Sequence, residues 1–167
     1  MVIRPERRAD IPAIRTVNRE AFEAPTEADL VDALREQAQP IVSLVAEDAD
    51  TIVGHILFSP AVLPAHPDIK IMGLAPMAVV PARQRQGVGS ALVQEGLDRC
   101  RQLGTVVVIV VGHSAYYPKF GFTPASRFGV ACEYEVPDDA FMLVELEKGV
   151  LRGKSGTVRY HEAFNLA

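Results

Sequence analysis

The sequence is poor in cysteine. Cys100 and Cys132 are the only two among its 167 residues. Their number and spacing fit neither a metal-ligand motif nor a disulfide framework. We therefore expect no metal ion and two small packed thiols. A chain without disulfides has, by default, a cytoplasmic location.

Long apolar runs and an excess of basic residues are also missing. The longest apolar run, residues 106–111, is far shorter than the roughly 20 residues of a membrane span. Charged residues begin at Arg4, so we expect no signal peptide. The net charge is −4, whereas proteins that bind nucleic acid neutralise its phosphates with a basic face. The composition thus predicts neither a membrane nor a nucleic acid as partner.

No internal repeat, linker or low-complexity segment divides the chain. Its 167 residues suit one domain with a sizeable core. Apolar residues make up 49% and charged residues 23%, both ordinary for a globular protein. We place the main domain at residues 1–148 and expect residues 149–167 to pack against it as a C-terminal extension.

The most informative stretch reads as a strand, a turn with two glycines and a helix. An apolar run at residues 74–80 precedes the turn, and apolar residues at near-helical spacing follow it. Gly87 and Gly89 let a ligand approach the backbone, and the first N–H groups of the helix point outward at the positive end of its dipole. Arg83 and Arg85 flank the turn, and no acid follows it within the first helical turn. The stretch predicts an anion-binding site, with an ordinary strand-to-helix connection as the alternative.

Two nucleotide-binding motifs fit the sequence poorly. A dinucleotide fingerprint needs a third glycine or an alanine where Leu92 stands. Residues 149–155 imitate a P-loop but are one residue short, and a strand-like segment follows instead of a helix. Neither a nicotinamide dinucleotide nor a nucleoside triphosphate is therefore favoured.

Two motifs in sequence order resemble the GNAT superfamily of N-acetyltransferases. They are Val79-Val80-Pro81 followed by Gln84-x-x-Gly87-x-Gly89, and Tyr117-Pro118-Lys119-Phe120-Gly121-Phe122. Preceded by Tyr116, the second motif is similar to that of a bacterial branch of predicted acetyltransferases. The resemblance implies a single-domain α/β GNAT fold, with a mixed central sheet that splays between strands at about 74–80 and 105–111 and is flanked by helices. It also implies acetyl-CoA as cosubstrate and a primary amine, on a small molecule or a peptide, as acceptor, and it leaves a homodimer open.

The same resemblance implies which residues hold the cosubstrate. Backbone groups of residues 77–79 would pair with the pantetheine arm, and the amides of residues 84–90 would bind the diphosphate. Lys119 either holds a phosphate or is a solvated loop charge. The expected cosubstrate-binding residues are Met77, Ala78, Val79, Gln84, Arg85, Gln86, Gly87, Val88, Gly89, Ser90, Tyr117 and Lys119.

Acetyl transfer to an amine needs a stabilised oxyanion and a proton for the leaving thiolate. We expect the Val79 N–H to polarise the thioester carbonyl while the amine attacks it directly. Tyr117 occupies the family's tyrosine position and is the expected acid, with packing of both tyrosines as the alternative. The apolar run at 74–80 has no carboxylate, so the base stays open. His113 is the first candidate for it, or else a substrate-binding residue. The weaker candidates are Glu20, Glu23, Glu133 and Glu135.

The missing carboxylate keeps a second function open, a non-catalytic acyl-CoA-binding or sensory module of the same fold.

Upstream, Asp10 is a plausible N-cap for one helix, and residues 26–29 resemble a capping box for the next. In the resembled family this pair of helices and its connection lie over the acceptor site. Residues 22–29 are therefore candidates for substrate contact, with a purely structural helical hairpin as the favoured alternative for any one of them. His55, within a strand pattern, is better interpreted as a hydrogen-bonded structural residue than as a proton carrier. Pro76 cannot donate a hydrogen bond to a sheet, so its strand should contain a bulge.

Overall fold

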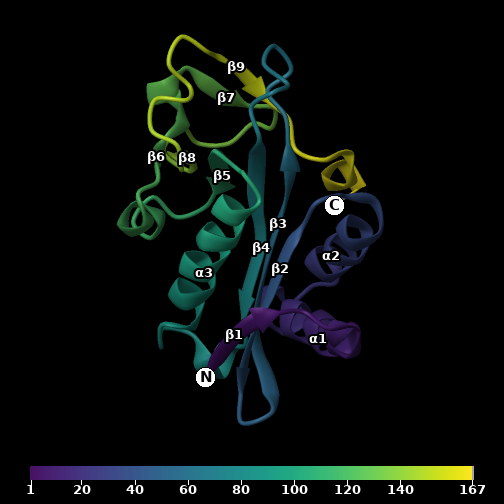
Figure 1. Cartoon of the computed structure of the whole chain (residues 1–167). Coiled ribbons are helices and arrows are strands. Elements are labelled where there is room, and N and C mark those ends of the chain that lie inside the picture. The colour runs from purple at the N-terminus through teal and green to yellow at the C-terminus, as the bar shows by residue number, and fades with distance from the viewer. Residues whose placement is uncertain (167) are drawn as a thin grey trace.

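A computed structural model describes residues 1–166 and shows a seven-stranded mixed sheet with helices on both faces (Figure 1). The strand order is β1-β2-β3-β4-β5-β8-β6, and β4 and β5 form its one parallel pair. These strands are β1 (Val2–Pro5), β2 (Val42–Asp48), β3 (Thr51–Ala61), β4 (Ile71–Val79), β5 (Val107–Val111), β6 (Thr123–Pro124) and β8 (Phe141–Glu145). The α/β fold predicted from the sequence is confirmed.

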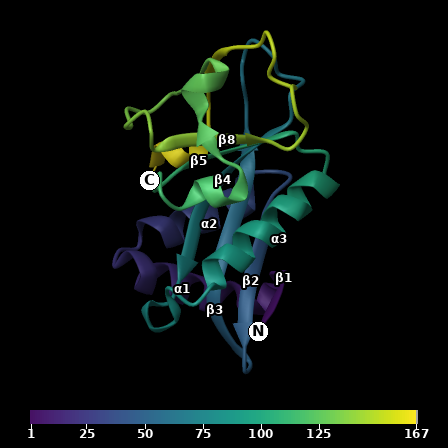
Figure 2. The same cartoon turned by 90° about the vertical axis from the view of Figure 1, so that its left-hand side faces the viewer.

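The three α-helices within residues 1–166 lie on opposite faces of the sheet. Helices α1 (Ile11–Phe22) and α2 (Thr26–Gln37) cover one face, and α3 (Val88–Gln102) covers the other (Figures 1 and 2). The α3 side is held by a core in which Leu92 is fully buried against the strands. A Cβ atom on Gly96 of α3 would lie 2.2 Å from the ring of Phe58 in β3. Glycine there permits the close approach of helix and sheet.

The starts of α1 and α2 differ from the expected caps. Asp10 does occupy the N-cap position of α1, but its side chain makes no cap bond to that helix. Its carboxylate instead accepts hydrogen bonds from the Arg7 N–H and the Arg4 guanidinium. The capping box at residues 26–29 is wrong, because Thr26 is already inside α2 and Pro25 is the N-cap. The Asp29 carboxylate pairs with Arg15 of α1 and so ties the two helices together.

Strand β4 contains the expected bulge. Met77 lies opposite Ile56 of β3 and Leu74 opposite Phe58, so two residues of β4 face one of β3. The extra residue falls at Ala75 or Pro76, where the proline has no N–H to donate. The bulge changes the direction of the second half of β4 relative to the sheet.

The C-terminal segment packs against the upper part of the sheet (Figure 1). Strand β9 (Gly156–Val158) pairs in parallel with β7 (Val130–Cys132), and Arg159 exchanges backbone hydrogen bonds with Val62. A Cβ atom on Gly73 of β4 would lie 2.7 Å from the Tyr160 ring, so the segment contacts the central sheet directly. Within residues 1–166, no helix has both the length and the apolar character needed to cross a bilayer.

Candidate functional site

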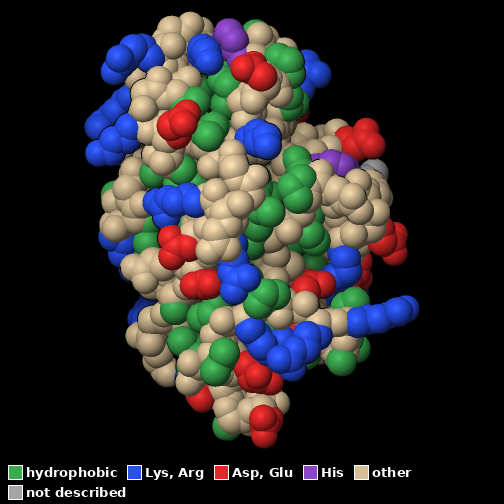
Figure 3. Space-filling view, viewed as in Figure 1, with side chains coloured by type: hydrophobic (Ala, Val, Ile, Leu, Met, Phe, Trp, Pro, Cys, Tyr) green, Lys and Arg blue, Asp and Glu red, His purple; other side chains and the backbone are tan. Residues whose placement is uncertain are grey.

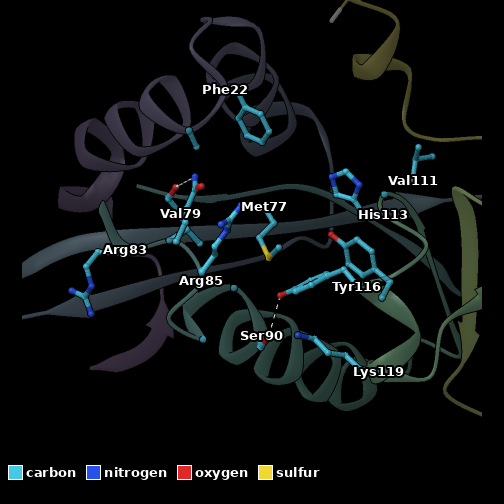
Figure 4. Close-up of a pocket in the computed structure, with 16 residues that line it drawn as sticks. Phe22, Met77, Val79, Arg83, Arg85, Ser90, Val111, His113, Tyr116 and Lys119 are labelled. Carbon is cyan, nitrogen blue, oxygen red and sulfur yellow. Dashed lines mark hydrogen bonds between the residues drawn. The ribbon is translucent and has the colours of Figure 1, made fainter. Parts of the chain in front are cut away.

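Strands β4 and β5 part at their carboxyl ends. They pair in register from Ile71 with Val107 to Leu74 with Val110, and β4 then continues to Val79 without β5 beside it. A cleft of about 760 Å³ opens where the pairing ends. It lies between the second half of β4, the start of α3, the loop after β5 and the end of α1 (Figure 4). The predicted splay of the sheet is thus present.

The backbone of β4 presents hydrogen-bonding groups to this cleft. The Val80 N–H donates to the Val53 carbonyl of β3 at 3.0 Å. Because successive residues of a strand direct their backbone groups to opposite edges, the N–H of Val79 faces away from β3, toward the cleft. The Val79 carbonyl accepts from Gln84 Nε2 at 3.0 Å, which agrees with that direction. By the same alternation, the backbone of Met77 faces the cleft as well.

The turn before α3 forms one end of the cleft. Gly87 is the N-cap residue with φ of 86°, a conformation that favours glycine. The first intrahelical bond joins the Ala91 N–H to the Gly87 carbonyl, so the N–H groups of residues 88–90 have no partner within the helix. No acid lies in this first turn. The local sequence therefore leaves these amides free to bind an anion, as the prediction requires.

Glycine 89 keeps this end of the cleft open. A Cβ atom on Gly89 would lie 3.1 Å from the Tyr116 hydroxyl and 3.3 Å from Met77 Cε. Any side chain at this position would therefore enter the space between α3 and β4. Gly87 differs, because a Cβ atom there would meet nothing within 4 Å. Gly87 is therefore needed for the backbone conformation of the turn, whereas Gly89 is needed to leave the cleft open.

Three basic residues border the anion end of the cleft. Arg83 is held by Asp48 of β2 at 2.8 Å and donates to Gln86. Arg85 and Lys119 take part in none of the ion pairs formed within residues 1–166. The Lys119 ammonium lies 4.1 Å from the centre of the Tyr116 ring, a cation–π contact. Both free cations can therefore meet a phosphate without breaking an existing pair.

The two tyrosines after β5 have different surroundings. The Tyr116 hydroxyl is hydrogen-bonded to Ser90 of α3 at 3.2 Å (Figure 4). Tyr117 is 7% exposed, packs edge-to-face against Phe122 and lines the cleft. Burial, and then the neighbouring Tyr116, raise the pKa of Tyr117 to about 12. Its hydroxyl therefore stays protonated at neutral pH and is available as a donor.

The far end of the cleft is formed by α1 and the end of β5. Ala21 and Phe22 are the last residues of α1, and both line it. Val111, the last residue of β5, and the exposed His113 of the following loop line it as well. Of residues 22–29, which the family resemblance made candidates for substrate contact, Phe22 alone lines the cleft.

Most of the expected site residues come together. Those lining the cleft are Met77, Val79, Gln84, Arg85, Gly87, Gly89, Ser90, His113, Tyr117 and Lys119. Ala78 and Val88 are buried and direct no side chain into it. Gln86 is exposed and bonds within its own turn, to the Ala82 carbonyl. For these three residues, only the prediction that their backbone groups bind the cosubstrate remains open.

The weaker carboxylate candidates lie elsewhere. Glu20 and Glu23 border a separate hollow beside Pro25, and Glu133 accepts a hydrogen bond from the Tyr160 N–H near the C-terminal segment. Tyr116, Ala21 and Val111 also line the cleft, although none of them was among the predicted site residues. The tyrosine doublet was the only local signal for Tyr116. No local signal marked the other two, because the fold alone brings them to the cleft.

Comparison with known proteins identifies the family. Residues 2–125 match the acetyltransferase (GNAT) domain, and the chain belongs to that family. It is 37% identical over 166 residues to the uncharacterized N-acetyltransferase YhbS of Escherichia coli, covering 99% of both chains. The expected enzyme class, an N-acetyltransferase, is confirmed by these matches.

Two related crystal structures contain the expected cosubstrate or its product. YhbS from Escherichia coli in complex with CoA has a TM-score of 0.92 and 36% identity, covering 98% of this chain and 91% of that one. A GNAT acetyltransferase from Brucella melitensis in complex with acetyl-CoA has a TM-score of 0.81 and 34% identity, covering 98% and 97%. The cleft described above fits such a molecule, because unpaired amides and free cations lie at one end and strand-edge backbone groups follow.

Proposed function

We propose that this protein transfers the acetyl group of acetyl-CoA to a primary amine in the cleft between β4 and β5. The observation that carries the proposal is the orientation of β4: the Val79 N–H faces a cleft that ends at the amides of residues 88–90. A donor for a developing oxyanion and a site for a diphosphate are thus joined in one channel. The CoA and acetyl-CoA complexes of the two relatives support the same donor.

Different residues of the cleft would bind different parts of acetyl-CoA. The amides of residues 88–90, together with Arg85, would hold the diphosphate, and Lys119 would meet a further phosphate. The backbone of Met77 and Val79 would pair with the pantetheine arm as a neighbouring strand does. Gly89 leaves room for that arm beside Met77.

The chemistry then needs few side chains. The amine nitrogen forms a bond to the acetyl carbon, and the carbon–sulfur bond breaks. The Val79 N–H stabilises the carbonyl oxygen as its charge grows. Tyr117, protonated at neutral pH, donates its proton to the leaving sulfur. His113, exposed on the far wall of the cleft, takes the proton that the amine loses.

Comparison of two neighbouring tyrosines tests the proposal. We expect CoA release with a panel of primary amines, lowered at least about tenfold in kcat by Tyr117→Phe. Tyr116→Phe is the matched control, because it removes a hydroxyl that bonds to Ser90 and should mainly weaken binding of acetyl-CoA. If acetyl-CoA binds but no amine accelerates CoA release, the protein is instead a non-catalytic acyl-CoA-binding module.

A further inference from the structure

The charge of the cleft is opposite to that of the whole chain. The net charge of the protein is −4, and acidic and basic side chains are interspersed over the face in Figure 3. By contrast, the charged side chains that line the cleft are Arg83, Arg85 and Lys119, and no carboxylate is among its lining residues within positions 1–166. The net charge of the chain is therefore a poor guide to the acceptor.

The acceptor end of the cleft is apolar and open. Phe22 is 39% exposed and Val111 is 43% exposed, and both line this cleft. In Figure 4, Phe22 lies on the α1 wall, across from Met77 and Val79 of β4. Exposed large apolar side chains that converge on one cavity indicate a surface that an apolar ligand group covers.

The end of α1 adds a place for a single positive charge. Ala21 and Phe22 are the last residues of α1, so its unpaired carbonyl groups lie at this end of the cleft. The C-terminus of a helix attracts one cation weakly, through the negative end of its dipole. Glu20 and Glu23, the acidic residues nearest to Ala21 and Phe22 in the sequence, border a different hollow.

We infer that the acceptor is a monoamine whose amino group is joined to an aromatic or branched apolar body and which bears no second cationic group. The inference rests on the proposed function. Phe22 and Val111 would contact the apolar body, and the amino group would approach the thioester between His113 and Tyr117. A polyamine or an aminoglycoside is disfavoured, because its further ammonium groups would find no carboxylate among the cleft-lining residues within positions 1–166.

A panel of acceptors tests the inference in the wild-type protein. It compares 2-phenylethylamine with spermidine and an aminoglycoside, and adds an uncharged peptide that begins with phenylalanine. We expect kcat/KM for 2-phenylethylamine to exceed that for spermidine by about tenfold or more. A higher kcat/KM for the peptide than for 2-phenylethylamine would support the inference and identify the acceptor amine as a peptide N-terminus. Spermidine or the aminoglycoside as the best acceptor would overturn the inference while leaving acetyl transfer intact.

Substitution of Phe22 provides an independent test. Phe22→Ala should raise KM for 2-phenylethylamine about tenfold while leaving affinity for acetyl-CoA unchanged. Leu103→Ala is the matched control, since Leu103 is 44% exposed at the end of α3 and does not line the cleft. Phe22→Glu should shift the preference toward spermidine by supplying the missing carboxylate. If both Phe22 variants keep the wild-type acceptor preference, Phe22 does not select the acceptor and the inference is wrong. Absence of turnover with every amine would instead count against the proposed function.

Discussion

The backbone of Gly112 lies directly against the ring of Tyr117: a Cβ atom added to Gly112 would lie 2.3 Å from Cε2 of that ring. The Gly112 backbone is itself fixed, because its N–H donates to the Ala140 carbonyl at 2.9 Å. The phenol, rather than the backbone, would therefore have to move. The position of Tyr117, the proposed acid, thus depends on residue 112 being a glycine.

Gly112→Ala should lower kcat by about tenfold or more, as we expect for Tyr117→Phe, because a displaced hydroxyl would no longer reach the leaving sulfur. The diphosphate end of the cleft is untouched, so CoA should still raise the melting temperature of the variant. Steady-state kinetics and thermal melts with and without CoA measure the two effects. A folded variant with wild-type kcat would show that the position of the Tyr117 ring does not limit the reaction.

Gly89→Ala should separate stability from cosubstrate binding. Gly89 lies inside α3 without a positive φ, and alanine in a helix is more stable than glycine by roughly 0.5–1 kcal/mol. The new methyl group, however, would enter the cleft beside the Tyr116 hydroxyl and Met77. We expect an unchanged or higher free energy of unfolding and about tenfold weaker binding of CoA, measured by denaturation and calorimetry. The exposed Gln94→Ala in the same helix is the control for the helix effect, and equal loss of CoA affinity in both variants would refute the role of Gly89.

Arg85→Gln should weaken acetyl-CoA binding by about three- to tenfold, because a charge-assisted contact to the diphosphate is lost. The loss should shrink as salt is added, since screening already weakens that contact in the wild type. S-acetylpantetheine, which lacks the diphosphate, should bind both proteins equally. Arg127→Gln, on a surface away from the cleft, is the control. Equal weakening of both donors by Arg85→Gln would place Arg85 outside the phosphate site.

The glycine turn before α3 and the bulge in β4 were predictable because their causes are local. The apolar run, the two glycines and the following helical spacing lie within a few residues of one another, and the N–H missing from Pro76 disrupts any ladder that contains it. The helix starts were less predictable. The Asp10 carboxylate is used by Arg4 and Arg7, and that of Asp29 by Arg15 of the other helix. Tertiary partners thus replaced the expected local caps.

The acceptor end of the cleft could not be predicted from local patterns. Phe22 ends a helix whose apolar stripe faces the sheet, and only the family resemblance, not its local sequence, made it one of the candidates at residues 22–29. Val111 likewise continues the buried pattern of β5, yet it is 43% exposed because β4 has already diverged. The location of each depends on the angle between elements far apart in the sequence.

His55 should make the protein less stable as the pH falls from about 6.5 to about 4. Its imidazole is fully buried between Asn18 of α1 and Ser43 of β2, with Nδ1 3.2 Å from the Asn18 amide nitrogen and Nε2 2.9 Å from the Ser43 hydroxyl. Ser43 also bonds to Glu6, which pairs with Arg35. The structural role expected for His55 fits these contacts.

Burial lowers the pKa of His55 to about 4; among the charged neighbours, Glu6 raises it and Arg35 lowers it further. Between pH 6.5 and 4 the unfolded chain therefore binds a proton that the native protein does not, so the free energy of unfolding falls with pH. The full loss is about 3 kcal/mol, from a shift of about 2.5 pKa units at 1.36 kcal/mol each.

Glu6 contributes in the same direction but at lower pH. Its burial raises its pKa, yet the Arg35 and Ser43 hydrogen bonds outweigh burial and leave the pKa below the usual 4.5. The stability due to Glu6 is present above that value and is lost as the pH falls below it. Urea unfolding between pH 4.5 and 7 therefore isolates the contribution of His55. His55→Gln should flatten the pH dependence over this range, whatever its effect on absolute stability, whereas His66→Gln in the loop after β3 is the control for loss of a histidine. An undiminished slope in His55→Gln would assign the acid sensitivity to other groups.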